Sequence, residues 1–305
     1  MPWTRPLALA AAACLLTSCS GRKDAAEGGA PPAAAVRTAD PRPARSPTPS
    51  AALPPYQRHA DLATAVLALL EPTTRVIGFG ELHARRDRPG VPSPLPRFTA
   101  EILPALAARS GHLVLETWTV DDGCGPVAAA ASASVLKAVR RPERTQDELG
   151  ELVAAASARR LPTSAMRVTC DDYRALSAGG DDALLYMMEL TTRELTRLAE
   201  TALRAPRPGL TLIYGGAIHN DLYPTSGLED WSYAAAVDRA AEHAYLEIDL
   251  ITPELAEADP ATARQPWAPL LAGRADLVSF RRGERSYVIV LPRTPPSATP
   301  PGAPP

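Results

Sequence analysis

The chain is poor in aromatic residues and in cysteine, and it carries almost no net charge. Only 5% of its 305 residues are aromatic, so a core must be built mainly from alanine, leucine and valine. The formal charge of −2 argues against a nucleic-acid partner, which requires a basic surface. No apolar run reaches the roughly 18 residues that a membrane-spanning helix needs. Proline is abundant, with 33 residues concentrated toward the two ends.

The first 18 residues are predicted to be a lipoprotein signal peptide. Arg5 precedes a short apolar stretch that ends in Leu16-Thr17-Ser18-Cys19. This ending resembles the lipobox of bacterial lipoproteins, in which the cysteine is lipidated and becomes the new N-terminus. The resemblance implies a lipid (palmitate) anchor on Cys19 and a cell-envelope location. Ser20, rather than Asp, after the cysteine favours the outer membrane facing the periplasm. An ordinary secretory signal is the alternative.

Two Pro-rich segments flank the predicted folded region. Residues 19–55 are rich in Ala, Pro and Ser, and after Cys19 they contain no Ile, Phe or Trp. Such a segment cannot bury enough apolar surface to offset its ordering entropy, so we predict a disordered tether. Residues 294–305 are predicted to be a second disordered tail. One domain is therefore expected over residues 56–293.

Two cysteines remain once the signal peptide and the lipid are accounted for. They are Cys124 and Cys170, and export would place them in an oxidising compartment. We favour a disulfide between them over two free buried thiols. Their spacing does not suggest a zinc site.

Apolar runs typical of strands alternate with segments of helical periodicity. Strands are predicted at 75–80, 112–118, 165–170, 210–214 and 244–251, and helices at 98–109, 131–141, 145–160, 183–204 and 232–243. The runs 277–280 and 286–291 flank Arg282-Gly283-Glu284 and predict a hairpin. We therefore expect an α/β fold: a mainly parallel sheet with helices on both faces and a C-terminal antiparallel hairpin.

Polar residues follow or end each predicted parallel strand. In open α/β sheets, ligands bind beyond the carboxyl ends of the strands. The candidates there are Glu81, His83, Glu116, Asp171, Asp172, His219, Asn220, Asp221, Glu247 and Asp249. Glu116 and Glu247 each lie inside an apolar run, where a carboxylate needs a partner or a metal.

A short repeat connects two of these strand ends. The segment from Val76 to His83 aligns with the segment from Leu212 to His219, and both end in Gly-x-x-His. Glycine at that position lets the backbone turn or approach a ligand closely. Two histidines with a carboxylate match a metal site that keeps one position open for water. The same groups can also act as general acid and base without metal. Two capped or core histidines are the structural alternative.

At these residues the chain resembles the erythromycin-esterase/ChaN-like superfamily, which includes the Tiki and TraB proteins. The resemblance rests on Gly80-Glu81-Leu82-His83, on Glu116 in Leu-Val-Leu-Glu, and on Gly216-Ala217-Ile218-His219. It implies that Glu81, His83, Glu116 and His219 line the site. Members include a metal-dependent peptidase, macrolide esterases and haem-binding lipoproteins.

Two functional classes follow from these residues. The first is a hydrolase of a small-molecule or peptide substrate. His83, His219 and one carboxylate, Glu116 or else Glu81, would hold a divalent metal or activate water directly, and the remaining carboxylate would be the general base. Arg85 or Arg86 would then stabilise an oxyanion or bind a substrate carboxylate. The second class is a haem- or small-ligand-binding lipoprotein without catalysis. Tyr214, Asn220 and Asp221 are further candidate ligand-binding residues, and a non-catalytic envelope scaffold is a third alternative.

Overall fold

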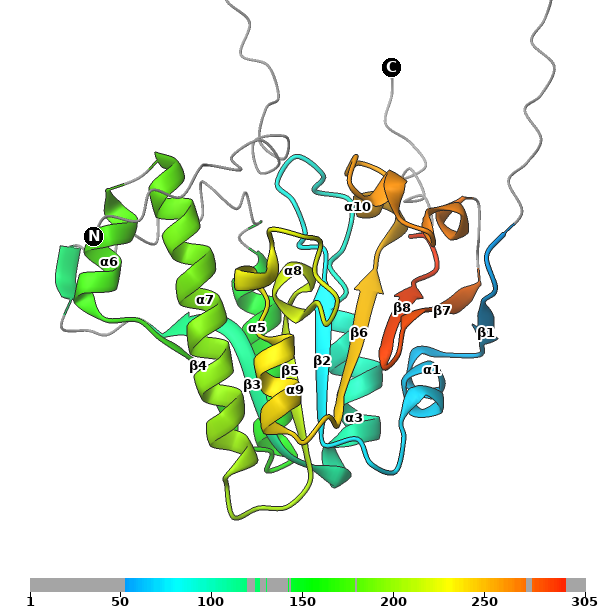
Figure 1. Ribbon diagram of the computed structural model, residues 1–305, viewed down its shortest axis with the longest axis horizontal. Helices are drawn as coiled ribbons and strands as arrows, with labels where there is room; N and C mark the ends of the chain where they lie inside the picture. Colours follow the sequence, from blue (N-terminus) through cyan, green and yellow to red (C-terminus); the bar gives the residue numbers. More distant parts are fainter. Residues whose placement is uncertain are drawn as a thin grey trace, which may run out of the picture. The chain divides into compact units, whose positions relative to one another are not determined.

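The computed structural model describes residues 53–119, 124–126, 130, 142, 144–178, 180–272 and 276–294. Its strands form a single eight-stranded sheet in the order β1-β7-β8-β6-β2-β5-β3-β4 (Figure 1). They are β1 (Gln57–His59), β2 (Val76–Glu81), β3 (Ser110–Thr119), β4 (Thr163–Arg167), β5 (Leu210–Gly216), β6 (Tyr245–Ile251), β7 (Leu277–Gly283) and β8 (Ser286–Val290). The six strands from β8 to β4 run parallel, whereas β7 is antiparallel to β8 and to β1. The predicted α/β fold with a mainly parallel sheet and a C-terminal antiparallel hairpin is confirmed.

Helices cover both faces of this sheet. The longer ones are α1 (Leu62–Leu69), α5 (Arg144–Ala158), α6 (Cys170–Ser177), α7 (Gly180–Leu203) and α9 (Ala234–Ala240). The short ones are α2 (Leu95–Arg97), η2 (Phe98–Ile102), α3 (Leu103–Leu106), η3 (Ala107–Arg109), α8 (Ala217–Asn220), η5 (Glu229–Trp231), α10 (Pro253–Ala256), η6 (Thr262–Arg264) and η7 (Ala268–Leu271).

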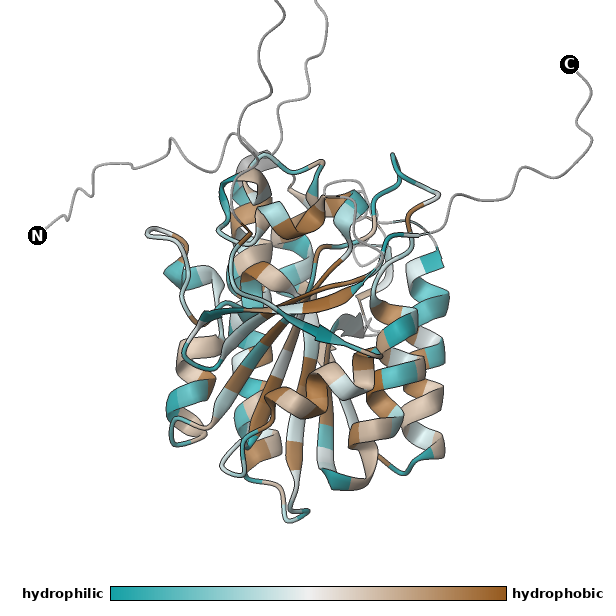
Figure 2. Ribbon diagram, turned by 90° about the vertical axis from the view of Figure 1, so that its right-hand side faces the viewer, coloured by the Kyte–Doolittle hydropathy of each residue, from teal (hydrophilic) through white to brown (hydrophobic). Residues whose placement is uncertain are grey.

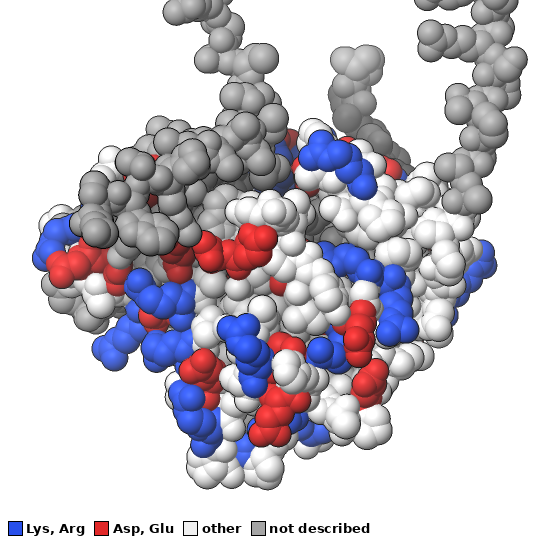
Figure 3. Space-filling model, in the orientation of Figure 1, with Lys and Arg blue, Asp and Glu red and all other residues white. Residues whose placement is uncertain are grey.

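The alternation of side chains along the strands produces two separate cores. Ile77 and Phe79 of β2 point to the face that α1, α3 and α5 cover. Val76 of β2 and Ile213 of β5 point to the opposite face, where α7 and α9 pack. The central strands are therefore mainly apolar on both faces, and the helices turn their hydrophilic sides outward (Figure 2). Figure 3 shows that positive and negative side chains are interspersed on the face it presents.

The predicted helix over 98–109 is three short pieces of different winding. A π-helical turn over Phe98–Ile102 leads into α3 and then into the 3-10 turn Ala107–Arg109. Pro104 interrupts the regular pattern because it has no backbone N–H to donate. The apolar side of this segment, with Phe98, Ile102 and Leu106, is nevertheless fully buried.

The predicted strand over 165–170 is wrong at its end. Strand β4 stops at Arg167, and helix α6 begins at Cys170. Thr169 caps this helix: its hydroxyl accepts from the Asp172 N–H, and the Asp172 carboxylate accepts from the Thr169 N–H. This reciprocal capping outweighs the β propensity of Val168 and Thr169.

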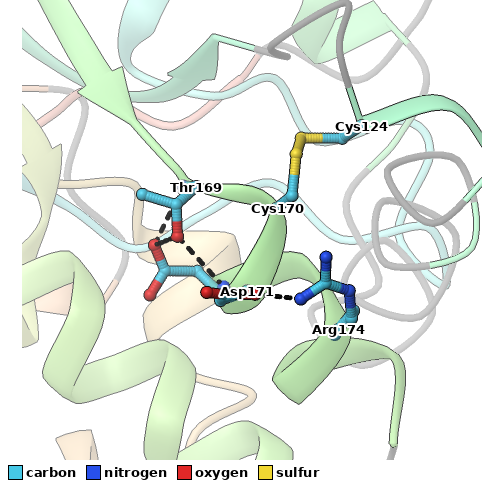
Figure 4. Close-up of a disulfide and its surroundings, with 6 residues drawn as sticks. Cys124, Thr169, Cys170, Asp171 and Arg174 are labelled. Carbon is cyan, nitrogen blue, oxygen red and sulfur yellow. Dashed lines mark hydrogen bonds and ion pairs between the residues drawn. A yellow bond between two sulfur atoms is a disulfide. The ribbon is translucent and has the colours of Figure 1, made fainter.

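Cys124 and Cys170 form the predicted disulfide, with their Cα atoms 5.1 Å apart. Figure 4 shows the bond at the first residue of α6, beside the Thr169 cap and the Asp171–Arg174 ion pair. It ties the start of α6 to a residue 46 positions earlier.

Several predictions lie outside the described residues. They concern the signal peptide 1–18, Cys19, residues 19–52 of the tether, the helix over 131–141 and the tail from residue 295. Within the described part of the chain, no helix combines the length and apolarity needed to cross a membrane.

Candidate active site

The carboxyl edge of the sheet carries a histidine held between two carboxylates. Glu81 is the last residue of β2, and His83 follows two residues later. Glu116 lies near the carboxyl end of β3. Strand β5 runs between β2 and β3 and supplies Tyr214. We call Glu81, His83, Glu116 and Tyr214 the histidine site.

Glu81 orients the imidazole of His83. Its Oε1 lies 2.8 Å from His83 Nδ1, and its Oε2 accepts a 2.5 Å hydrogen bond from the Tyr214 hydroxyl. Glu81 is only 6% exposed, so both carboxylate oxygens depend on these partners. A carboxylate can only accept, which places the hydrogen of a neutral imidazole on Nδ1. The lone pair is then on Nε2.

Glu116 lies at the other nitrogen of the same ring. Its Oε1 is 3.6 Å from His83 Nε2, and its Oε2 accepts a 2.5 Å hydrogen bond from the Gly216 N–H. The pairing of β3 with β4 shifts register between Leu115 and Trp118. Such a bulge redirects a side chain at the point where it occurs, and Glu116 occupies it.

Two glycines make room for this arrangement. A Cβ atom on Gly215 would lie 2.5 Å from Glu116 Oε2, and one on Gly216 would lie 2.8 Å from His83 Nε2. Real Cβ atoms essentially never approach other heavy atoms so closely, so any side chain here would displace Glu116 or His83. Gly216, the glycine of the second Gly-x-x-His motif, therefore makes room for His83, the histidine of the first motif.

His219 has a different environment from His83. It belongs to α8, it is 5% exposed, and its Nδ1 lies 2.7 Å from the Trp231 carbonyl oxygen and 3.3 Å from Thr192 Oγ1. Because the carbonyl can only accept, Nδ1 carries a hydrogen. His83, by contrast, keeps 26% of its side chain exposed.

The predicted metal set is only partly supported by this geometry. His83 Nε2 and Glu116 Oε1 are close enough to contact the same atom. However, no group of three or more His, Cys, Asp or Glu side chains within the described ranges is arranged to hold a metal ion. A protein metal site of the predicted type needs three such ligands. The described residues therefore do not fit the predicted set of His83, Glu116 and His219.

The other predicted ligand-binding residues take structural positions. Arg85 makes a bidentate ion pair with Asp87, with donor–acceptor distances of 2.9 and 2.8 Å. Arg86 is exposed. Tyr214 is buried, and it contacts the Phe98 ring and donates to Glu81. Asn220 and Asp221 belong to a second polar group.

That second group lies across β2 from the histidine site, and three of its members, Asn220, Glu247 and Asp249, are buried. It contains Asn220, Asp221, Glu247, Asp249 and Arg282, and we call it the buried carboxylate cluster. Arg282 of β7 donates to Asp221 and to Glu247. Asn220 donates to Asp249 and to the Gly78 carbonyl oxygen at 3.2 and 3.1 Å.

The electrostatics of this cluster follow from its burial. Burial and the neighbouring Asp249 raise the pKa of Glu247 to about 8, against the opposing effect of Arg282. Burial likewise raises the pKa of Asp249. The position of Glu247 inside an apolar run signalled the need for a partner, but nothing in the sequence identified Arg282 as that partner.

The comparisons with known proteins provide little beyond this geometry. No protein-family model matches the chain, and no curated protein matches it. Among solved structures, the type III effector HopBA1 is similar at 17% identity and a TM-score of 0.39, with 80% of this chain and 98% of that chain covered.

Proposed function

We propose that this chain is a hydrolase in which His83 acts as the general base. The observation that carries the proposal is the hydrogen bond between Glu81 and His83 Nδ1, which places Nε2 of this partly exposed ring beside Glu116. A carboxylate behind an imidazole holds its tautomer and stabilises the imidazolium that forms during catalysis. The Gly-x-x-His motifs, which resemble those of the erythromycin-esterase/ChaN-like superfamily, support the same class of reaction.

The chemistry can be written with this chain's own residues. His83 Nε2 removes a proton from water, and the hydroxide adds to the carbonyl carbon of an ester or peptide substrate. The positive charge on the imidazole then lies between Glu81 and Glu116. When the tetrahedral intermediate collapses, His83 returns the proton to the leaving group, so the enzyme is regenerated unchanged.

Hydrolysis of p-nitrophenyl acetate tests this proposal. We expect His83→Gln to lower kcat/KM by at least about 100-fold, within the range that general-base catalysis contributes. His243→Gln is the matched control because His243 lies on the surface, where its side chain is 72% exposed. Equal turnover by wild type and His83→Gln would contradict the proposal. Activity lost in EDTA and restored by zinc would replace the metal-free route with a metal-dependent one.

We also propose that the chain is a lipoprotein anchored through Cys19. The Leu-Thr-Ser-Cys ending of the N-terminal apolar stretch supports this anchor. Labelling of cells with a palmitate analogue tests it, with Cys19→Ser as the variant. We expect the label on the wild-type chain and its loss in Cys19→Ser. Equal labelling of both would contradict the anchor.

A further inference from the structure

A cavity of about 450 Å³ lies at the amino edge of the sheet, opposite the histidine site. It is bounded by residues that precede β2 and β3, by the start of β5 and by the end of α7. Strand β2 separates the cavity from Glu81 by its whole length of six residues, about 20 Å.

The charged residues that line the cavity are all arginines. Arg75, Arg109 and Arg207 line it, and the lining contains no Asp or Glu. Arg75 contacts Glu242 at 3.4 Å, but Glu242 is 84% exposed, and such surface pairs contribute only about 0–1 kcal/mol. Within the described ranges, Arg109 has no hydrogen-bond or ion-pair partner.

Arg207 is anchored without losing its binding capacity. It donates one N–H to the Arg160 carbonyl oxygen at 2.7 Å. A guanidinium has five N–H donors, so this bond fixes the side chain and leaves four donors for a ligand.

The end of helix α7 does not cancel this positive charge. A helix C-terminus carries about half an elementary negative charge. Three guanidinium groups carry three positive charges. The backbone turn from Ala205 N–H to the Ala202 carbonyl oxygen also satisfies one of the last helical carbonyl groups. The three arginines therefore outweigh the helix end and the exposed Glu242, so the charge around the cavity is net positive.

A glycine brings two of the arginine-bearing segments together. Gly209 has a φ of +136°, and a Cβ there would lie 2.8 Å from both the Arg109 carbonyl oxygen and the Gly111 nitrogen. Only glycine permits this approach. The loop that carries Arg207 is thereby held directly against the start of β3, next to Arg109.

We propose that this cavity binds a small organic anion that bears a phosphate group. Guanidinium groups match phosphate oxygens in charge and in geometry. The volume lies within the range of about 300–1,000 Å³ that is typical of small-molecule sites, which leaves room for a carbon skeleton beside the phosphate. Leu203, Pro208 and Leu210 provide apolar contacts for that skeleton.

Calorimetric titration of the full chain tests the site with three probes: inorganic pyrophosphate, adenosine 5′-monophosphate and glycerol 3-phosphate. We expect saturable binding of pyrophosphate, and a loss of about 10-fold or more in affinity for both Arg109→Gln and Arg75→Gln, because each variant removes a charge-assisted contact. Arg264→Gln is the control, since Arg264 is exposed, lies outside the cavity and changes the net charge equally. Its affinity should stay within about two-fold of wild type.

A chemical measurement on the wild-type chain removes any dependence on variant folding. Pyrophosphate should protect Arg75 and Arg109, but not Arg264, from phenylglyoxal, as read by mass spectrometry. No saturable binding at about 10 mM pyrophosphate, or an equal loss in the Arg264→Gln control, would overturn the site. Tighter binding of adenosine monophosphate indicates a nucleotide, and tighter binding of glycerol phosphate indicates a lipid headgroup. His83→Gln should bind pyrophosphate like wild type, so this proposal and the hydrolase proposal fail independently.

Discussion

The histidine site and the buried carboxylate cluster lie on opposite faces of β2 and use similar residue types for different purposes. In the histidine site, Glu81 and Glu116 flank a ring that is 26% exposed. In the cluster, Glu247 is fully buried and Arg282 provides the opposite charge. A carboxylate at the end of a parallel strand is thus a candidate catalytic group only where solvent can reach the side chain that it contacts. A carboxylate whose contacts are buried instead fixes the positions of the strands and helices around it.

The cluster has a clear structural task. It joins β6, the loop after α8 and the β7–β8 hairpin through Glu247, Asp221 and Arg282. Asn220, one residue after His219, is held at the same time by Gly78 and Asp249. The cluster therefore fixes α8, and with it the position of His219, against the sheet.

The largest effect should come from removing the cation of the cluster. Arg282→Met removes the guanidinium that pairs with Asp221 and with the fully buried Glu247, and the loss of one partner of a buried pair costs about 3–5 kcal/mol. Urea denaturation measures this loss, and Arg281→Met is the control because Arg281 is exposed. A loss below about 1 kcal/mol would mean that the carboxylates are held neutral without Arg282, and the cluster would then need another explanation.

Two glycines of β2 and β5 allow a direct comparison of the two groups. A Cβ on Gly78 would overlap Asn220 and Tyr245, which are both fully buried and cannot move. We expect Gly78→Ala to lower stability by about 1–3 kcal/mol or more. A Cβ on Gly216 meets the ring of His83, which is partly exposed and can move, so Gly216→Ala should cost less stability but at least about 10-fold in ester hydrolysis.

Urea denaturation and p-nitrophenyl acetate turnover, measured on both variants, separate the two effects. Gly90→Ala is the control, because a Cβ there meets no atom within 4 Å. If Gly78→Ala and Gly216→Ala lost stability and activity in the same proportion, the histidine site and the buried carboxylate cluster would not have separate roles in activity and stability.

The pH dependence of stability should include a contribution from Glu247 of the cluster. The folded state raises the pKa of Glu247 from 4.5 to about 8, so it binds more protons than the unfolded state between these values. Stability therefore falls as pH rises through this range, by up to about 1.4 kcal/mol per pH unit. Burial lowers the pKa values of His59 and His112 from 6.5, so these histidines make stability rise with pH. Their effect is confined to pH values below about 6.5.

Urea denaturation between pH 7 and about 8.5 measures this slope, and Glu247→Gln should flatten it because the amide does not titrate. A slope unchanged in Glu247→Gln would assign the effect to another group.

Strands β2, β5 and β6 could be predicted closely because each is a buried, largely apolar run. β6, for example, occupies 245–251 against a prediction of 244–251. The parallel topology then explains why Glu81, His83 and Glu116 meet at one edge. Tertiary partners could not be predicted in this way. Arg282 reaches Glu247 across 35 residues, and the short edge strand β1 exists only because it pairs with β7.

The histidines show the same limit. The Gly-x-x-His repeat treats His83 and His219 as equivalent, yet the structure gives them unlike surroundings. The difference arises from the Trp231 carbonyl group and Thr192, which come from segments that the repeat does not include. A local pattern can place a residue at the end of a strand, but it does not determine which groups surround its ring.

The smallest effect we expect concerns the Tyr214 hydroxyl. Tyr214→Phe removes the 2.5 Å hydrogen bond to Glu81 Oε2, which is worth about 1 kcal/mol, and kcat/KM should fall about five-fold. Tyr214 is a positioning residue, so its loss should also shift the pH profile of hydrolysis, because Glu81 would hold His83 with an altered charge distribution. Tyr287→Phe is the control, since Tyr287 packs against the same core. If the pH profile were unchanged and both variants lost stability equally, Tyr214 would have only a packing role. The contrast between the histidine site and the buried carboxylate cluster would then be weaker.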